Sequence, residues 1–217
     1  MAKAYLTISS KNYSSWCLRG WLLCKMARID FEERRVPLDE AATRAELLLA
    51  SPSVRVPCLN HMGIAVWDTL AIAEYLHELS PDAGLLPKSC AARAHCRAIC
   101  GEMHAGFFNL RSALPMNLKA RLQGFSVPKA ALADIERIKT IWHDCLAAYG
   151  GSFLFGEPCM ADARYAPVCT RFITYGVQLD PECAAYCGRI MAWPPMTEWL
   201  AAALAEPEKI EELELQF

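Results

Sequence analysis

The sequence predicts a small α/β unit followed by an all-helical part. Short apolar runs with strand character alternate with helical periods over the first 79 residues. A segment rich in breakers follows at 80–87, and the chain after it has helical length and period. Hydrophobic residues make up 54% of the 217 residues, which is ample for a buried core and argues against disorder.

The first part reads as strand–helix–strand–helix–strand–strand–helix, the order of a compact α/β unit. Ser14 or Ser15 caps its first helix, and Asp68 caps its last one. The predicted elements are strand 5–8, helix 15–26, strand 31–38, helix 42–50, two short strands that begin at Pro57 and at Ile64, and helix 69–79.

We expect three segments: a first domain at 1–80, a linker at 81–88 and a helical domain at 89–217. The predicted helices of the last segment span 89–114, 128–149, 160–175, 181–190 and 194–204. Cys159 and Asp162 have the spacing of a capping box, in which the Asp162 carboxylate accepts the cap N–H. The turn at 156–158 predicts that Cys159 is only partly covered and serves the fold alone.

Composition excludes several classes. Net charge is −2 and basic runs are short, so nucleic acid is not an expected partner. Apolar runs are shorter than a membrane span and the first residues do not read as a signal peptide, so we expect a cytoplasmic protein without a membrane partner. Eleven cysteines, an odd number, read as reduced and mostly buried thiols.

The most informative stretch is Arg55-Val56-Pro57-Cys58-Leu59, followed by Asp68-Thr69 at a helix start. The backbone groups beside Pro57 can pair with a peptide as a strand would. The free N–H groups after Asp68 can hold a carboxylate of the same peptide. The pattern therefore predicts a site for a small peptide.

These residues resemble the thioredoxin-like half of the soluble glutathione S-transferases, and the helical second half resembles that family too. The resemblance implies a cis Val56–Pro57 bond that pairs with the cysteinyl unit of glutathione. It also implies that Asp68 and Thr69 hold the γ-glutamyl end. Arg55 and Lys11 are candidates for the glycyl carboxylate, although each is alternatively a solvated surface cation.

The stretch from Lys11 to Arg19 joins the first strand to the first helix and resembles the zeta class of these transferases. Alignment on Trp16 and Arg19 puts the family's active serine on Asn12. Three candidates for thiol activation result: Ser14, Asn12 and Ser15. Either serine is alternatively only a helix cap. Cys17 lies one turn into the helix, where a buried structural thiol is expected.

Further along, the resemblance implies that one long helix borders a pocket for the second substrate. Its candidates are His104, Phe107, Phe108 and Arg111, with core or dimer packing as the alternative. Cys96, Cys100 and His104 form a stripe at helical spacing. We interpret that stripe as helix packing, and we expect no metal site.

The resemblance implies a glutathione transferase that acts in detoxification, with glutathione as cosubstrate and a small apolar electrophile as partner. Family members are homodimers, so a homodimer is expected. A glutathione-dependent cis–trans isomerase of the maleylacetoacetate type is an alternative. A non-catalytic binding module that keeps the fold is a third interpretation.

Overall fold

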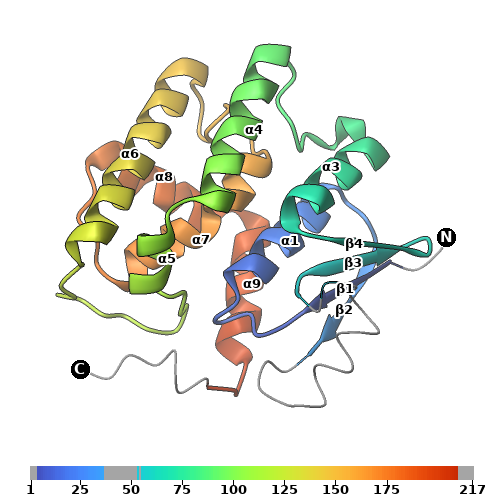
Figure 1. Cartoon of the computed structure of the whole chain (residues 1–217), viewed down its shortest axis with the longest axis horizontal. Helices are drawn as coiled ribbons and strands as arrows, with labels where there is room; N and C mark the ends of the chain where they lie inside the picture. The colour runs from blue at the N-terminus through green and yellow to red at the C-terminus, as the bar shows by residue number, and fades with distance from the viewer. Residues whose placement is uncertain (1–3, 37–52, 54, 210–217) are drawn as a thin grey trace.

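The computed structural model describes residues 4–36, 53 and 55–209. A four-stranded sheet lies on one side of the molecule, and most of the helices lie on the other (Figure 1). The first elements are β1 (Ala4–Ile8), α1 (Ser15–Met26), β2 (Phe31–Arg35), β3 (Cys58–His61), β4 (Ile64–Trp67) and α3 (Thr69–Leu79). The later ones are η1 (Pro81–Ala83), α4 (Cys90–Ala105), α5 (Phe108–Ala113), α6 (Lys129–Tyr149), α7 (Met160–Thr174), α8 (Pro181–Ala192) and α9 (Pro194–Ala205).

The strands lie in the order β2-β1-β3-β4. β1 pairs with β2 in parallel and with β3 antiparallel, so Leu6 faces Glu33 on one side and Leu59 on the other. The predicted fold class, a thioredoxin-like α/β unit followed by helices, is confirmed. The strand predicted at 31–38 is β2, which ends at Arg35, and residues 37–38 lie outside the described residues. The helix predicted at 42–50 lies outside them as well.

Helix α1 is the centre around which the two parts pack. It contacts α3 in the first part and both α7 and α9 in the second. Trp21, Leu22 and Leu23 are three consecutive buried residues, so α1 has no polar face over this turn. A helix that is apolar on all sides is buried on all sides. The residues that precede α1 are therefore fixed from both parts of the chain.

The helix predicted at 89–114 is wrong in one respect, because it breaks into α4 and α5. Phe107 has a left-handed backbone, with φ of 55°, which ends the helical run. Asp134 of α6 accepts a hydrogen bond from the N–H of Leu110 at 2.8 Å, so another helix satisfies the start of α5. The turn between α4 and α5 is thus stabilised by a residue of α6.

Helix α7 begins at the predicted capping box. The Asp162 carboxylate accepts hydrogen bonds from Cys159 N–H at 2.9 Å, Leu154 N–H at 3.1 Å and the Tyr186 hydroxyl at 2.9 Å. The expectation that Cys159 is only partly covered is wrong, since 2% of it is exposed and its Sγ lies 3.9 Å from that of Cys96. In the part of the chain that is described, no helix has the length and apolar character of a membrane span.

Candidate active site

A cleft of about 460 Å³ lies between the sheet unit and the helical part. Six of the residues predicted for ligand binding line it: Arg55, Val56, Pro57, Asp68, Thr69 and His104. Trp16, Ser53 and Trp67 line it too and were missed as site residues. Trp16 directly follows the two serines at the start of α1. Its position beside the candidate motif could have marked it as a site residue, but the sequence analysis used it only to align that motif.

The Val56–Pro57 peptide bond is cis, as predicted. Gly20 of α1 makes room for the proline ring, because a Cβ there would lie 2.6 Å from Pro57 Cγ. Val56 is half-buried and Pro57 is buried at the cleft wall. Gly20 therefore lets α1 pack directly against the segment that is predicted to bind peptide.

Asp68 begins α3, as predicted, with an unusual backbone φ of 69°. Its Oδ1 accepts the N–H of Leu70 at 2.7 Å, and its Oδ2 lies 3.2 Å from Nε2 of His104. The side chain is 45% exposed. Asp is among the few residue types that adopt positive φ readily, and such conformations are enriched at functional sites. The carboxylate is thus held at the mouth of the cleft with one oxygen directed across it.

Arginines from three helices stand behind the cleft wall. The guanidinium of Arg19 lies 4.6 Å from the ring centre of Trp16, and that of Arg111 lies 5.5 Å from it. Arg164 Nη1 donates to the hydroxyl of Thr69, the buried residue after Asp68. The tryptophan and threonine that line the cleft are therefore each backed by positive charge.

The arginine cluster also includes Arg171, and Arg19, Arg164 and Arg171 are buried whereas Arg111 is half-buried. Burial lowers the pKa of Arg19 most, and the charges of Arg171, Arg164 and Arg111 lower it further. In the described part of the chain, Arg19 Nη2, Arg111 Nε and both Nε and Nη2 of Arg164 are buried without a hydrogen-bond partner. Unpaired buried donors are expensive, so the cluster is best satisfied by an anion.

The positive charges of the arginine cluster also act on the imidazole of His104. Burial lowers the pKa of its imidazole most, Asp68 opposes that shift, and Arg164, Arg19 and Arg111 reinforce it. Its ring packs against Trp16 with centroids 5.1 Å apart. His104 is therefore a mainly neutral imidazole in the cleft near neutral pH.

None of the three predicted activating residues is among those that line the cleft. Ser14 caps α1 by accepting the N–H of Cys17 at 3.3 Å, and it is half-buried. The buried Ser15 hydroxyl accepts from Arg171 Nη2 at 3.2 Å. Asn12 is fully buried; its amide donates to Asn117 at 3.1 Å and its oxygen accepts from Lys119 N–H at 3.1 Å. Of the three, Ser14 is the one whose side chain is not enclosed.

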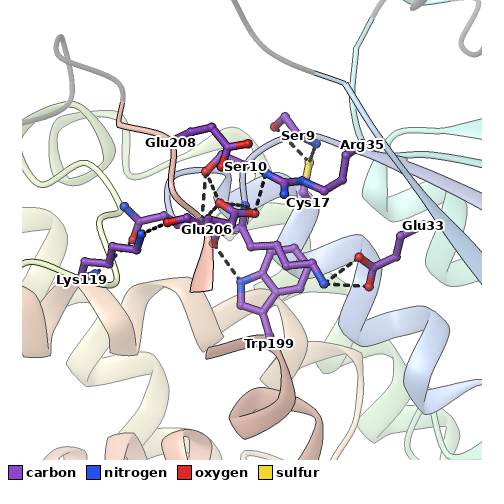
Figure 2. Close-up of polar contacts among 11 residues, drawn as sticks. Ser9, Ser10, Cys17, Glu33, Arg35, Lys119, Trp199, Glu206 and Glu208 are labelled. Carbon is purple, nitrogen blue, oxygen red and sulfur yellow. Dashed lines mark hydrogen bonds and ion pairs between the residues drawn. The ribbon is translucent and has the colours of Figure 1, made fainter. Parts of the chain in front are cut away.

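The loop before α1 is held by the carboxylate of Glu206, which follows α9 (Figure 2). Glu206 accepts from Ser10 Oγ at 2.8 Å and from Lys11 N–H at 2.8 Å, and Arg35 pairs with it at 3.0 Å. The predicted glycyl partner Lys11 is buried outside the cleft lining, with its ammonium 2.7 Å from Glu33. The structure thus brings Arg55, but not Lys11, to the cleft.

The residues predicted for the second-substrate pocket do not lie together in one site. His104 lines the cleft and Arg111 stacks behind Trp16. Phe107 is buried, whereas Phe108 is 71% exposed at the start of α5. The break at Phe107 separates Phe108, which begins α5, from His104, which belongs to α4.

The predicted structural cysteines are buried. Cys17 is inaccessible, and burial raises the pKa of its thiol against the contacts of Ser14 and Ser9. Cys96 and Cys100 lie in the core below His104, as the packing interpretation expects. A buried thiol with a raised pKa is a poor nucleophile.

Comparison with known proteins agrees with this geometry. Residues 13–79 match the family of the glutathione S-transferase N-terminal domain. A glutathione transferase homologue from a Burkholderia, solved with bound glutathione, superposes with a TM-score of 0.72 at 23% identity, covering 95% of this chain and 100% of that one. The protein has the glutathione S-transferase fold.

Two further similar proteins are named as isomerases. A probable maleylacetoacetate isomerase of Caenorhabditis elegans is 29% identical over 169 residues, which cover 77% of this chain and 78% of that protein. A maleyl pyruvate isomerase, a bacterial transferase of the zeta class, superposes with a TM-score of 0.66 at 20% identity, covering 96% of this chain and all of the other. The resemblance stated from the sequence is therefore confirmed for the N-terminal domain and for the fold.

Proposed function

We propose that this protein binds glutathione in the cleft and uses its thiolate to attack a small electrophile. Val56 offers backbone pairing to the cysteinyl unit, Asp68 offers a carboxylate to the α-amino group, and Arg55 offers a cation to the glycyl carboxylate. The observation that carries this proposal is that the Val56–Pro57 segment and the start of α3 line one cleft.

The arginine cluster, rather than the serine motif, supplies the positive charge that activates the bound thiol. A thiol that binds beside Trp16 meets a wall backed by Arg19, Arg111 and Arg164. Nearby positive charge favours the thiolate over the thiol, which lowers the pKa of the bound thiol. Ser14 is then an auxiliary donor, and activation is mainly electrostatic.

The same arginines favour a second candidate function, isomerisation of an unsaturated dicarboxylate. In that reaction the thiolate adds to a carbon of the conjugated double bond, and the electron pair moves to the carbonyl oxygen. The remaining single bond rotates, and the thiolate leaves as the double bond re-forms. Glutathione is regenerated, and arginine suits the carboxylates of such a substrate.

Turnover with two substrate classes tests the choice. Conjugation of a neutral halonitroarene consumes glutathione, whereas isomerisation of a cis dicarboxylate does not. If the isomerase candidate is right, Arg111→Gln raises KM for the dicarboxylate at least about tenfold, as expected for a lost charged contact. Arg111→Lys, which keeps the charge, should restore part of that loss.

Binding of glutathione without turnover of either class would reject both enzyme functions and leave a binding module. Ser14→Ala adds a second measurement, because we expect it to slow turnover while glutathione affinity stays the same. Unchanged turnover in Ser14→Ala would assign thiol activation to the arginine cluster alone.

We also propose a cytoplasmic homodimer. Apolar residues of the β3–β4 hairpin support a buried interface, since Met62 is 65% exposed and Ile64 51%. Free cysteines support a reducing compartment. Light scattering should give twice the 24.1 kDa of one chain at micromolar concentration, and a value near one chain would refute the dimer.

A further inference from the structure

A second cluster of reactive side chains lies between α6 and α8, on the side of the helical part away from the sheet (Figure 1). His143 of α6 meets Asp180, the N-cap of α8, and Cys183 in its first turn. One nitrogen, one oxygen and one sulfur from these residues lie within 4.8 Å of one another. The proposed reaction uses none of the three.

We propose that His143, Asp180 and Cys183 bind a zinc-like divalent transition metal that joins α6 to α8. His143 Nε2 lies 3.1 Å from Asp180 Oδ2 and 3.6 Å from Cys183 Sγ. Tetrahedral zinc with bonds of about 2.0–2.3 Å holds neighbouring N, O and S ligands roughly 3.3–3.6 Å apart. These two separations are close to those of ligands around one ion, and the three ligand atoms all lie within 4.8 Å of one another.

The other ring nitrogen of His143 is oriented for such a site. Its Nδ1 lies 2.5 Å from the Glu182 carboxylate, which accepts a hydrogen bond from it. That bond keeps a proton on Nδ1. Nε2 faces the acceptor oxygen of Asp180, so it carries a proton that a bound metal must displace. Carboxylate–histidine–metal arrangements of this kind fix the tautomer of a ligating histidine.

Asp180 is similarly divided between two tasks. Its Oδ1 caps α8 by accepting the Cys183 N–H at 3.0 Å, and its Oδ2 faces His143. The carboxylate can therefore ligate through one oxygen without loosening the helix start.

The charges around the cluster suit a cation. Asp180 and Glu182 supply two carboxylates, while Lys139, one turn before His143, is paired with Glu136 at 3.0 Å. Cys183 is buried, and a metal that binds its sulfur must displace the thiol proton. His143 is 41% exposed, which leaves an open side where water completes the coordination. Imidazole with thiolate selects zinc or cobalt over magnesium or calcium.

Titration of the reduced full-length protein with cobalt(II), without glutathione, tests this site. A cobalt–thiolate bond gives a charge-transfer absorption in the near ultraviolet, and one equivalent of cobalt should saturate it. Cys183→Ser should abolish the band. Cys90→Ser is the matched control, because Cys90 is an exposed thiol at the start of α4, and it should keep the band.

His143→Gln keeps the test decisive if the buried Cys183 variant folds poorly. It should lower cobalt affinity at least about tenfold, and Glu182→Gln should lower it by about 10–100-fold through the histidine. Zinc should raise the thermal midpoint of the wild type but not of His143→Gln. A band that survives in Cys183→Ser, a band lost in Cys90→Ser, or an affinity unchanged in His143→Gln would overturn the proposal.

Discussion

Two aspartates near the starts of helices, Asp68 and Asp162, have different surroundings. Asp68 at the start of α3 accepts one backbone N–H, is 45% exposed and turns its second oxygen toward His104 in the cleft. Asp162 in the first turn of α7 accepts three hydrogen bonds and is inaccessible to solvent. The Asp68 carboxylate can still accept hydrogen bonds from a ligand, whereas the Asp162 carboxylate accepts its hydrogen bonds from the protein itself.

The comparison separates two uses of one residue type by burial and by the number of donors already satisfied. Burial raises the pKa of Asp162 to about 6 even though three hydrogen bonds oppose the shift. Such a carboxylate is retained where it fixes backbone geometry. An exposed cap with positive φ costs backbone energy, and Asp68 keeps one oxygen on the cleft side beside His104, which is the pattern of a binding group.

The largest expected effect is on stability and distinguishes the two positions. Asp162→Ala leaves three buried donors unpaired at about 1–3 kcal/mol each. Relief from burying the charge returns up to about 3 kcal/mol, judged from the raised pKa. We expect a net loss near 3 kcal/mol in urea unfolding. Asp68→Ala should lose only about 1 kcal/mol, the worth of a cap. Equal losses would break the comparison.

The next effect is on glutathione binding, where Asp68 should matter more than Asp162. Asp68→Ala should weaken glutathione binding by roughly 1.5–3 kcal/mol in calorimetric titration, because a charge-assisted contact to the ligand's ammonium is lost. Asp68→Asn is the matched control, since it keeps the cap to Leu70 N–H but loses the charge. Wild-type affinity in Asp68→Ala would reject Asp68 as a binding residue.

Sequence reasoning predicted the elements whose signals are local. Ser14, Asp68 and Pro57 each act within a few residues of their place in the chain, so caps and strand starts were read correctly. The break after α4 was missed because its stabilising partner, Asp134, comes from α6. A hydrogen bond between distant segments leaves no periodic trace in either segment.

The candidate site divides in the same way. Val56, Pro57, Asp68 and Thr69 lie within one short stretch, and the cleft contains them all. The arginine cluster is built from α1, α5 and α7, and only the fold brings those guanidinium groups together. Asn12 was chosen by alignment with a family motif, whereas the structure surrounds it with Asn117 and Lys119 from the helical part.

A third effect is the pH dependence that Asp162 gives to stability. Its folded pKa of about 6 lies above the roughly 3.9 of an unfolded aspartate, so the folded state binds the proton more tightly between these values. Stability from this group is therefore present below about pH 4 and is lost as pH rises through 6. The loss has a slope of at most about 1.4 kcal/mol per pH unit.

Asp162→Asn removes that titration while an amide oxygen still accepts from Leu154 and Tyr186. The unfolding free energy of both proteins is measured from pH 4.5 to 7 in steps of about half a unit. Subtracting the value of the variant from that of the wild type removes the contribution that the other carboxylates make to the pH dependence. The difference should fall as pH rises. A flat difference would mean that Asp162 has an ordinary pKa in the folded state.

The smallest effect concerns Cys159, the first residue of the box that holds Asp162. On the sequence alone, Cys159→Ser should stabilise the fold, because serine is a better cap by about 0.5–2 kcal/mol. The burial of Cys159 beside the Cys96 thiol changes the balance, since a buried hydroxyl costs about 1–3 kcal/mol unless it finds an acceptor. Sulfur is a weak acceptor, so that cost is only partly offset.

We therefore expect Cys159→Ser to lower the urea midpoint by an amount equivalent to about 1 kcal/mol, without a change in slope. Cys90→Ser, at an exposed thiol, should stay within about 0.5 kcal/mol of the wild type. Cys159→Ala separates the two causes, because it removes the cap acceptor without burying a hydroxyl. If Cys159→Ser proves more stable than Cys159→Ala by more than about 1 kcal/mol, capping outweighs desolvation here, and the start of α7 then follows the same rule as the exposed start of α3.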